Sequence, residues 1–229
     1  MIPMLIVYLM RRVKKTSFLY RKLNGLKKIA LKLKVLLMLF TVSLTYGFNT
    51  GPINYMTYNV VRNNVVIGTI KINSTTNNGS VTYSLNSNIV AKYLLKFNIS
   101  GKETSIFENG VLVYSSVYRK LNNKVKTNHT ITYKEGRYQL DNSPEGKHLN
   151  FAKIQNNLVT LYFNEPKGLN SVFCDNLKQM VKLQSLGDGR YKVFFSKGKY
   201  NIFYYEGGKC VKIEANSALF SVTLIPALS

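Results

Sequence analysis

Apolar and polar residues alternate along most of the chain from residue 53 onward. In residues 53–61 and 65–72 the alternation occupies two arms, which are separated by Arg62, Asn63 and Asn64. Alternation with a period of two is typical of a strand with one buried face, and Asn tolerates the left-handed backbone of a tight turn. The pattern recurs about every ten residues, and further turns are expected at residues 74–80, 108–110, 134–136, 187–189 and 207–208.

Two segments fit the alternation less well. Residues 88–99 fit a helical face as well as a strand, but their β-branched and aromatic content favours one long buried strand. Residues 158–166 are expected to form a strand that ends near Glu165, because Pro166 cannot donate a hydrogen bond to a neighbouring strand. Residues 142–146 are expected to form a loop.

Residues 170–180 are the best candidate for a short helix, with Asp175 and Asn176 as capping residues. The rest of the pattern predicts a mainly β fold, because about a dozen short strands follow one another through hairpin turns. A sheet of so many strands curls or closes. We therefore predict, over residues 48–229, one domain built as an antiparallel up-and-down meander that forms a curved half-barrel or a barrel.

Residues 27–47 have the layout of an export signal. Basic residues come first, an uninterrupted apolar run from Val35 to Val42 follows, and the small residue Gly47 stands where a signal peptidase would cut. The run is shorter than the roughly 18 residues of a membrane-spanning helix. A cleaved signal in a basic leader (residues 1–47) is therefore favoured, and the rest would be periplasmic or secreted. The alternative is an uncleaved helix at residues 29–47 that anchors the protein in the inner membrane.

The charge of the chain is concentrated in this leader. The formal net charge is +22, but residues 1–47 hold ten Lys or Arg and no acidic residue, which leaves 22 basic and ten acidic residues in the rest. Lysines scattered singly along strands usually face solvent. They predict a weak attraction to an anionic membrane or polymer, and no recognisable nucleic-acid-binding motif accompanies them.

Cys174 and Cys210 leave two alternatives open. In an oxidising compartment they would form a disulfide, and otherwise they would be buried free thiols that pack as small apolar groups. The histidines, His129 and His148, lie far apart in the sequence and lack the short paired spacing of a zinc site. No metal site and no cofactor are expected.

Tyr and Phe are the most numerous candidates for contacts with a ligand. Tyr114 and Tyr118 share one strand face, and further Tyr and Phe crowd residues 191–205. Alternation places about half of such side chains inward, where they form either an ordinary aromatic core or the lining of an apolar ligand cavity with a few hydroxyl groups. The cavity candidates are Tyr58, Tyr83, Tyr114, Tyr118, Tyr162, Phe195, Phe203 and Tyr205.

Acidic residues are few, and none lies in a recognisable catalytic motif. Glu165 and Asp175 are candidates for orienting a base or binding a cation, although Glu165 also fits a solvent-facing turn and Asp175 a helix cap. No Gly-x-Ser-x-Gly turn, phosphate-binding loop or dinucleotide motif occurs. We therefore assign no catalytic residue from the sequence.

Several phrases, in this order, resemble one family. They are TYNVVRNNVVIGTIKI, LVYSSVYRKLNNKVK, LYFNEP, VFCDN and KYNIFYYEGGKCVKIEA, and together they resemble an uncharacterised, exported family of bacterial envelope proteins, domain of unknown function 6134. The resemblance covers Tyr55 to about Pro226 and implies an exported β-rich protein without an assigned activity. The opening strands also look like families whose curved sheets enclose an apolar cavity, several of which handle lipids.

Three functional hypotheses follow, in order of preference. The first is a binding protein of the cell envelope that holds an apolar or amphipathic ligand in the curved sheet. The second is a structural or interaction protein of an envelope complex, which uses a sheet edge or the basic surface. The third is a hydrolase, which requires Glu165, Asp175 and His129 to converge in a cleft.

Overall fold

The computed structural model describes residues 53–92, 96–141, 147–217 and 221–227. The chain divides into two compact units, Met1–Asn49 and Thr50–Ser229, and every described residue belongs to the second. The predicted export signal with its cleavage site at Gly47, and the expected loop at residues 142–146, lie outside the described residues.

The described residues form strands joined mostly by short hairpin turns, with one 3-10 helix, η1 (Leu158–Tyr162). The strands are β1 (Asn54–Arg62), β2 (Val65–Asn77), β3 (Ser80–Lys92), β4 (Lys96–Glu108), β5 (Val111–Leu121), β6 (Lys124–Lys134), β7 (Arg137–Asp141), β8 (His148–Leu149), β9 (Ser171–Cys174), β10 (Gln179–Gly187), β11 (Arg190–Ser196), β12 (Lys199–Glu206), β13 (Lys209–Asn216) and β14 (Ser221–Pro226).

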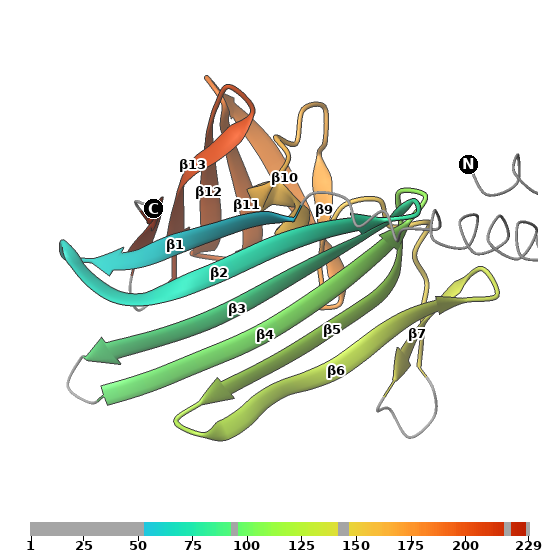
Figure 1. The fold of residues 1–229 in the computed structure, drawn as a ribbon, viewed down its shortest axis with the longest axis horizontal. Helices are drawn as coiled ribbons and strands as arrows, with labels where there is room; N and C mark the ends of the chain where they lie inside the picture. Colours follow the sequence, from blue (N-terminus) through green and yellow to red (C-terminus); the bar gives the residue numbers. More distant parts are fainter. Residues whose placement is uncertain (1–52, 93–95, 142–146, 218–220, 228–229) are drawn as a thin grey trace, which may run out of the picture. The chain divides into compact units, whose positions relative to one another are not determined.

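All of these strands belong to one 14-stranded sheet. Its two halves are β1–β8 and β9–β14, and in Figure 1 the strands β1–β7 lie in front of β9–β13. The first strand pairs antiparallel with the last, with Val60 of β1 opposite Leu224 of β14. The sheet therefore runs from β9 to β14 and continues through β1 to β8, and its free edges are β8 and β9. The predicted mainly β, antiparallel meander is confirmed. Closure into a barrel is wrong, because these two edges do not pair with each other.

Asparagine and glycine make the turns that the sequence predicted. Asn63 and Asn64, between β1 and β2, have φ values of 48° and 62°, and Asn109 and Gly110, between β4 and β5, have 48° and 76°. Positive φ at both central residues is typical of the tight turn whose twist matches that of the flanking strands. The hairpins predicted at these two positions are confirmed.

Residues 88–99 do not form a single strand. They comprise the end of β3 and the start of β4, which pair with each other so that Ile89 lies opposite Ile99. The division into two strands was missed because no Gly, Pro or Asn stands between Lys92 and Lys96 to mark it.

The strand expected at residues 158–166 and the helix expected at residues 170–180 are also wrong. Residues 158–162 form η1, and residues 171–174 and 179–187 form the paired strands β9 and β10. The capping residues around Asp175 favour a helix locally, but tertiary packing decides the conformation. Val172 and Phe173 are both fully buried, and a strand lets side chains on both of its faces pack. Lys178 closes this hairpin with a φ of 55°.

Residues 150–170, here called the inner segment, form hydrogen bonds to strands near both free edges of the sheet. The backbone N–H of Ile154 donates to the Tyr138 hydroxyl on β7 at 2.9 Å, and its carbonyl accepts from the N–H of Leu112 on β5 at 2.8 Å. Two residues further on, the Asn156 carbonyl accepts from the N–H of Phe173 on β9 at 3.1 Å. The inner segment thus connects the two edges that strand pairing leaves apart.

Gly68 tests how tightly β2 and β3 are packed. A Cβ atom at this position would lie 2.3 Å from the Asn88 carbonyl oxygen and 2.6 Å from the Ile89 Cα, and neither backbone atom can move without distorting the sheet. We expect Gly68→Ala to lower the free energy of unfolding by about 2 kcal/mol or more, measured by urea unfolding with tyrosine fluorescence. Gly101→Ala is the matched control, because its Cβ would meet the Ser87 hydroxyl at 2.8 Å, and that group can rotate. Equal losses in both variants would contradict this account.

Candidate functional site

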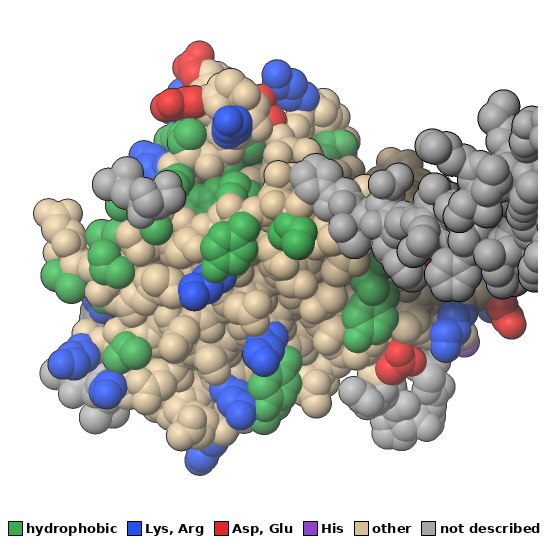
Figure 2. Space-filling view, viewed as in Figure 1, with side chains coloured by type: hydrophobic (Ala, Val, Ile, Leu, Met, Phe, Trp, Pro, Cys, Tyr) green, Lys and Arg blue, Asp and Glu red, His purple; other side chains and the backbone are tan. Residues whose placement is uncertain are grey.

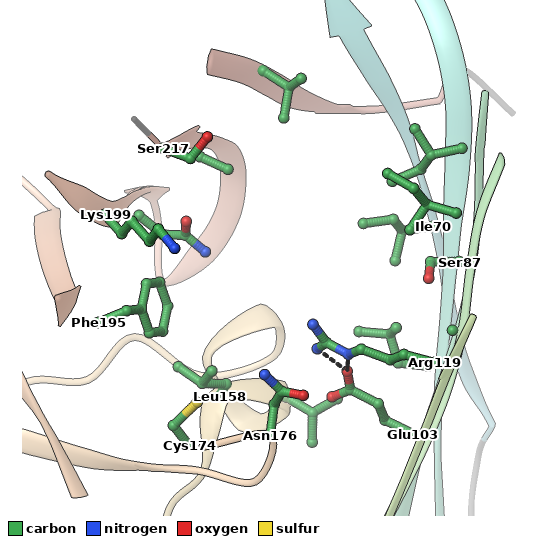
Figure 3. A pocket seen from close by; sticks show the side chains of 18 of the residues that line it. Ile70, Ser87, Glu103, Arg119, Leu158, Cys174, Asn176, Phe195, Lys199 and Ser217 are labelled. Carbon is green, nitrogen blue, oxygen red and sulfur yellow. Dashed lines mark hydrogen bonds and ion pairs between the residues drawn. The ribbon is translucent and has the colours of Figure 1, made fainter. Parts of the chain in front are cut away.

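A cavity of about 490 Å³ lies between the two halves of the sheet (Figure 3). One wall comes from β2–β5 and the other from β11–β14, while η1, Cys174, Asn176 and Leu177 supply further lining. The volume and the mainly apolar lining are typical of a small-molecule site. The apolar lining residues are Ile70, Leu85, Ile89, Ile99, Leu158, Val159, Tyr162, Cys174, Leu177, Phe195, Phe203, Ala215 and Val222.

Strand alternation places the first wall. Leu85, Ser87 and Ile89 occupy alternate positions of β3, so their side chains share one face, and Glu103, Gly101 and Ile99 of β4 lie directly opposite them. Gly101 has no side chain, which leaves room beside Ser87.

An ion pair lies within this apolar lining. Arg119 of β5 donates from Nε to Glu103 Oε1 at 3.1 Å, and its Nη2 donates to the same oxygen. Burial is the largest single influence on the pKa of Arg119 and lowers it. The charge of Glu103 and the hydrogen bonds to it, with smaller contributions from Cys174 and Tyr162, together raise the pKa above its ordinary value, so the guanidinium stays charged. A guanidinium has five N–H groups, and the bonds to Glu103 use two of them. Lys199 lies across the cavity from this pair (Figure 3).

The predicted aromatic residues divide between this cavity and the core. Tyr162, Phe195 and Phe203 line the cavity. Tyr58 and Tyr83 line a second cavity of about 960 Å³, which also includes Tyr162. Tyr162 packs edge-on against Tyr58 at 5.5 Å between ring centroids, so this pair lies where the two cavities approach each other. Burial raises the pKa of Tyr162, so its hydroxyl stays neutral at pH 7.

Tyr205 lies in the core, and its hydroxyl donates to the Leu161 carbonyl. The structure places Tyr114 and Tyr118 on the outer face of the sheet and not in the cavity. Tyr118 lines a shallow groove together with Lys71 and Lys102, whereas Arg119 faces the cavity from the next position in β5.

A buried polar cluster holds the inner segment and the β9–β10 turn against β4–β6. The Asp175 carboxylate accepts hydrogen bonds from the Ser115 hydroxyl and from Asn157 Nδ2, the latter at 3.1 Å. Asn157 Nδ2 also donates to Ser105 Oγ at 2.8 Å. His129 Nε2 lies 2.9 Å from the Asp175 carbonyl oxygen, so this nitrogen carries the hydrogen and donates it.

Burial dominates the electrostatics of this cluster. Burial raises the pKa of Asp175 to about 6, against the hydrogen bonds from Ser115 and Asn157, which lower it. Burial also lowers the pKa of His129, so its ring is neutral at pH 7. The side-chain oxygen of Asn157 is buried without a hydrogen-bond partner, and a protonated Asp175 would offer a donor in this region.

The cluster does not have the arrangement that a hydrolase requires. Ser115 donates to Asp175 and not to His129, and none of these three buried residues lines the cavity, although Cys174 and Asn176 on either side of Asp175 do. Glu165 does not join them, because it accepts from the Tyr191 hydroxyl at 2.9 Å and pairs with Lys167 at 3.2 Å. Asp175 and His129 thus meet in the core, without Glu165 and without a cleft.

Cys174 and Cys210 are free, buried thiols in this structure. Burial raises the pKa of each to about 11, which keeps them protonated and unreactive at neutral pH. His148 lies on β8. The described residues contain no group of three His, Cys, Asp or Glu that could hold a metal ion, and within the same residues no helix is long and apolar enough to cross a bilayer.

Comparisons with known proteins name a family but no activity. The family model described as Domain of unknown function (DUF6134) matches residues 58–227. The chain is similar to a solved structure titled "Beta-barrel-like Protein of Domain of Unknown Function DUF1849 from Brucella abortus", with 11% identity and a TM-score of 0.48, over 79% of this chain and 98% of that one. No curated protein matches the sequence.

The Asp175 carboxyl group gives a pH-dependent prediction. Because its pKa is raised in the folded state, the fold binds this proton more tightly than the unfolded chain, and the contribution of Asp175 to stability rises as the pH falls through about 6. Asp175→Asn is neutral at every pH and keeps an acceptor oxygen. The free energy of unfolding of the variant minus that of the natural protein should therefore increase by roughly 2–3 kcal/mol as the pH rises from 4 to 8. Urea unfolding at several pH values measures this difference.

His129 works in the opposite direction, since its lowered pKa makes the fold lose stability as the pH falls. The difference between the variant and the natural protein removes this contribution, because both contain His129. A difference that stays constant between pH 4 and pH 8 would show that Asp175 does not titrate as described.

Proposed function

The chain belongs to the DUF6134 family of domains of unknown function, and we propose that it is an exported binding protein for an amphipathic ligand, held in the cavity between the two halves of its sheet. The observation that carries the proposal is the cavity itself. It is mainly apolar, it has the volume of a small-molecule site, and its cationic groups lie on opposite walls.

The apolar lining supports an aliphatic or aromatic ligand body. Ile70 faces Phe195 across the space (Figure 3), and Leu85, Ile89 and Val222 also line it. Burying apolar ligand surface between such walls is worth about 25 cal/mol per Å². The inward part of the ligand would displace water that these side chains cannot bind.

The charged groups support an acidic head group. Lys199 is the first residue of β12 and is exposed to solvent, so a head group there would keep part of its hydration. Arg119 is largely neutralised by Glu103, so it offers N–H donors more than net charge. Lys199 is therefore the residue that would favour an anion over a neutral head.

Export is the second part of the proposal. It rests on the basic and apolar pattern of residues 27–47, and it places a binding protein where lipids and other envelope components have to cross an aqueous space.

A cavity-filling variant tests the binding role. Ser87→Phe places a ring in the cavity from β3, and we expect it to weaken binding of anilinonaphthalene sulfonate and its displacement by oleate at least about tenfold, because the ligand and the ring compete for one volume. Ser116→Phe adds the same ring on the outer face and should change binding less than about twofold. Fluorescence titration measures both.

Ala215→Leu fills the cavity from the opposite wall and provides a second variant if Ser87→Phe does not fold. Circular dichroism checks that each variant keeps the sheet. Equal probe affinity in the natural protein and both folded cavity variants would overturn the proposal.

A further inference from the structure

Charges are distributed unequally between the two ends of the sheet. The antiparallel order brings the end of β1, the start of β2, the end of β3, and the starts of β4 and β6 to one end of the strands. The opposite strand ends hold the acidic residues of the hairpin turns, which are Glu108, Glu135, Asp188 and Glu206. We call residues 62–66, 90–92, 96 and 124–126 the tip surface.

The tip surface is basic and contains no acidic residue. Arg62, Lys92, Lys96, Lys124 and Lys126 all lie in it. Figure 2 shows blue and green side chains along this end of β1–β6, while red ones gather at the other strand ends and around β7. On the second half of the sheet, Lys197 and Lys199 lie at the corresponding end of β11 and β12. The carboxylate of Glu214, further along β13, is paired with Lys212 at 3.0 Å.

Exposed valines stand among these cations. Val65 is 61% exposed, Val66 54%, Val125 51% and Val90 38%, and Arg62 and Lys92 line one shallow groove with three of them. Single exposed apolar residues are normal, but four at one end of the strands, in a groove with Arg62 and Lys92 or between Lys124 and Lys126, are not explained by packing within this chain.

The cavity lies toward the same end. Ile89 is three residues before Lys92, and Ile99 is three after Lys96. Val222 is the second residue of β14, which starts at the same end of the sheet as the tip surface. All three line the cavity, as does Lys199. A surface that approached the tips would therefore come close to the ligand.

We propose that the tip surface docks the protein on a bilayer that contains anionic phospholipid. Lysines and arginines near such a bilayer are attracted by its surface potential, and valines among them gain by burial at the headgroup boundary. An anionic polysaccharide or nucleic acid would satisfy the cations but would give the valines nothing to bury in, which is why the bilayer is favoured. The docking rests on the proposed function for its purpose, because the docked cavity would exchange an amphipathic ligand with the membrane.

A site-specific probe tests the docking in the full chain. A nitrobenzoxadiazole label on Val66→Cys reports the tip surface, and the same label on Thr76→Cys reports the opposite end of the same strand, while the buried natural cysteines stay unlabelled. With vesicles of phosphatidylcholine and phosphatidylglycerol, we expect a blue shift and a rise in emission at Val66→Cys only. Vesicles of phosphatidylcholine alone should give a much smaller response.

Charge-matched variants in the labelled protein locate the interaction. Lys92→Gln, Lys96→Gln and Lys124→Gln together should weaken the vesicle response at least about tenfold. The control, Lys134→Gln, Arg137→Gln and Lys209→Gln, removes the same charge at the opposite end and should change it less than about twofold. Equal losses would overturn the inference in favour of net charge alone, and so would an equal response of the label at both ends. A response to polygalacturonate or duplex DNA as large as that to vesicles would overturn it in favour of a polyanion.

Binding of anilinonaphthalene sulfonate without vesicles separates this inference from the proposed function. The tip variants should keep that binding, because none of the three lysines lines the cavity. Retained probe binding with no vesicle response at Val66→Cys would overturn the docking alone, whereas vesicle docking with no probe binding in the natural protein would overturn the ligand-binding role and leave the docking supported.

Discussion

Hydrogen bonds from the inner segment to β5, β7 and β9 join the two edges of a sheet that does not close on itself. Because β1 pairs with β14, the opening of the meander lies between two strands that are consecutive in the sequence, and the chain between them is available to fill it. The segment enters the curve of the sheet and occupies part of the space there. The cavity is the part that it leaves, with η1, Cys174, Asn176 and Leu177 among its lining.

The polar cluster around Asp175 fixes where this segment lies. A carboxyl group buried without a cation costs stability, and its raised pKa expresses that cost. Its bonds to Ser115 and Asn157 are directional, however, and they join the β9–β10 turn and the inner segment to β5. A purely apolar contact would hold these parts with less specificity of position. The cluster thus holds the inner segment and the β9–β10 turn, both of which contribute to the cavity lining, in place against β5.

The hairpins could be predicted from the sequence because their information is local. Asn63, Asn64 and Asn109 adopt the positive φ values that their turns require, and alternation marks the strands between them. The inner segment could not be predicted in the same way, since residues 158–162 and 171–174 take their conformations from burial against distant strands. Arg119 was overlooked although alternation from Val117 places it inward, because a charged residue in a strand ordinarily faces solvent.

The apolar cavity with its ion pair is the observation behind the proposed ligand, which has an apolar body and an acidic head group. Native mass spectrometry of the protein, purified without detergent and incubated with a total lipid extract, tests this claim most directly. The account predicts a complex with one amphipathic molecule, which collisional activation releases for identification. A spectrum that contains only the mass of the protein alone would contradict it.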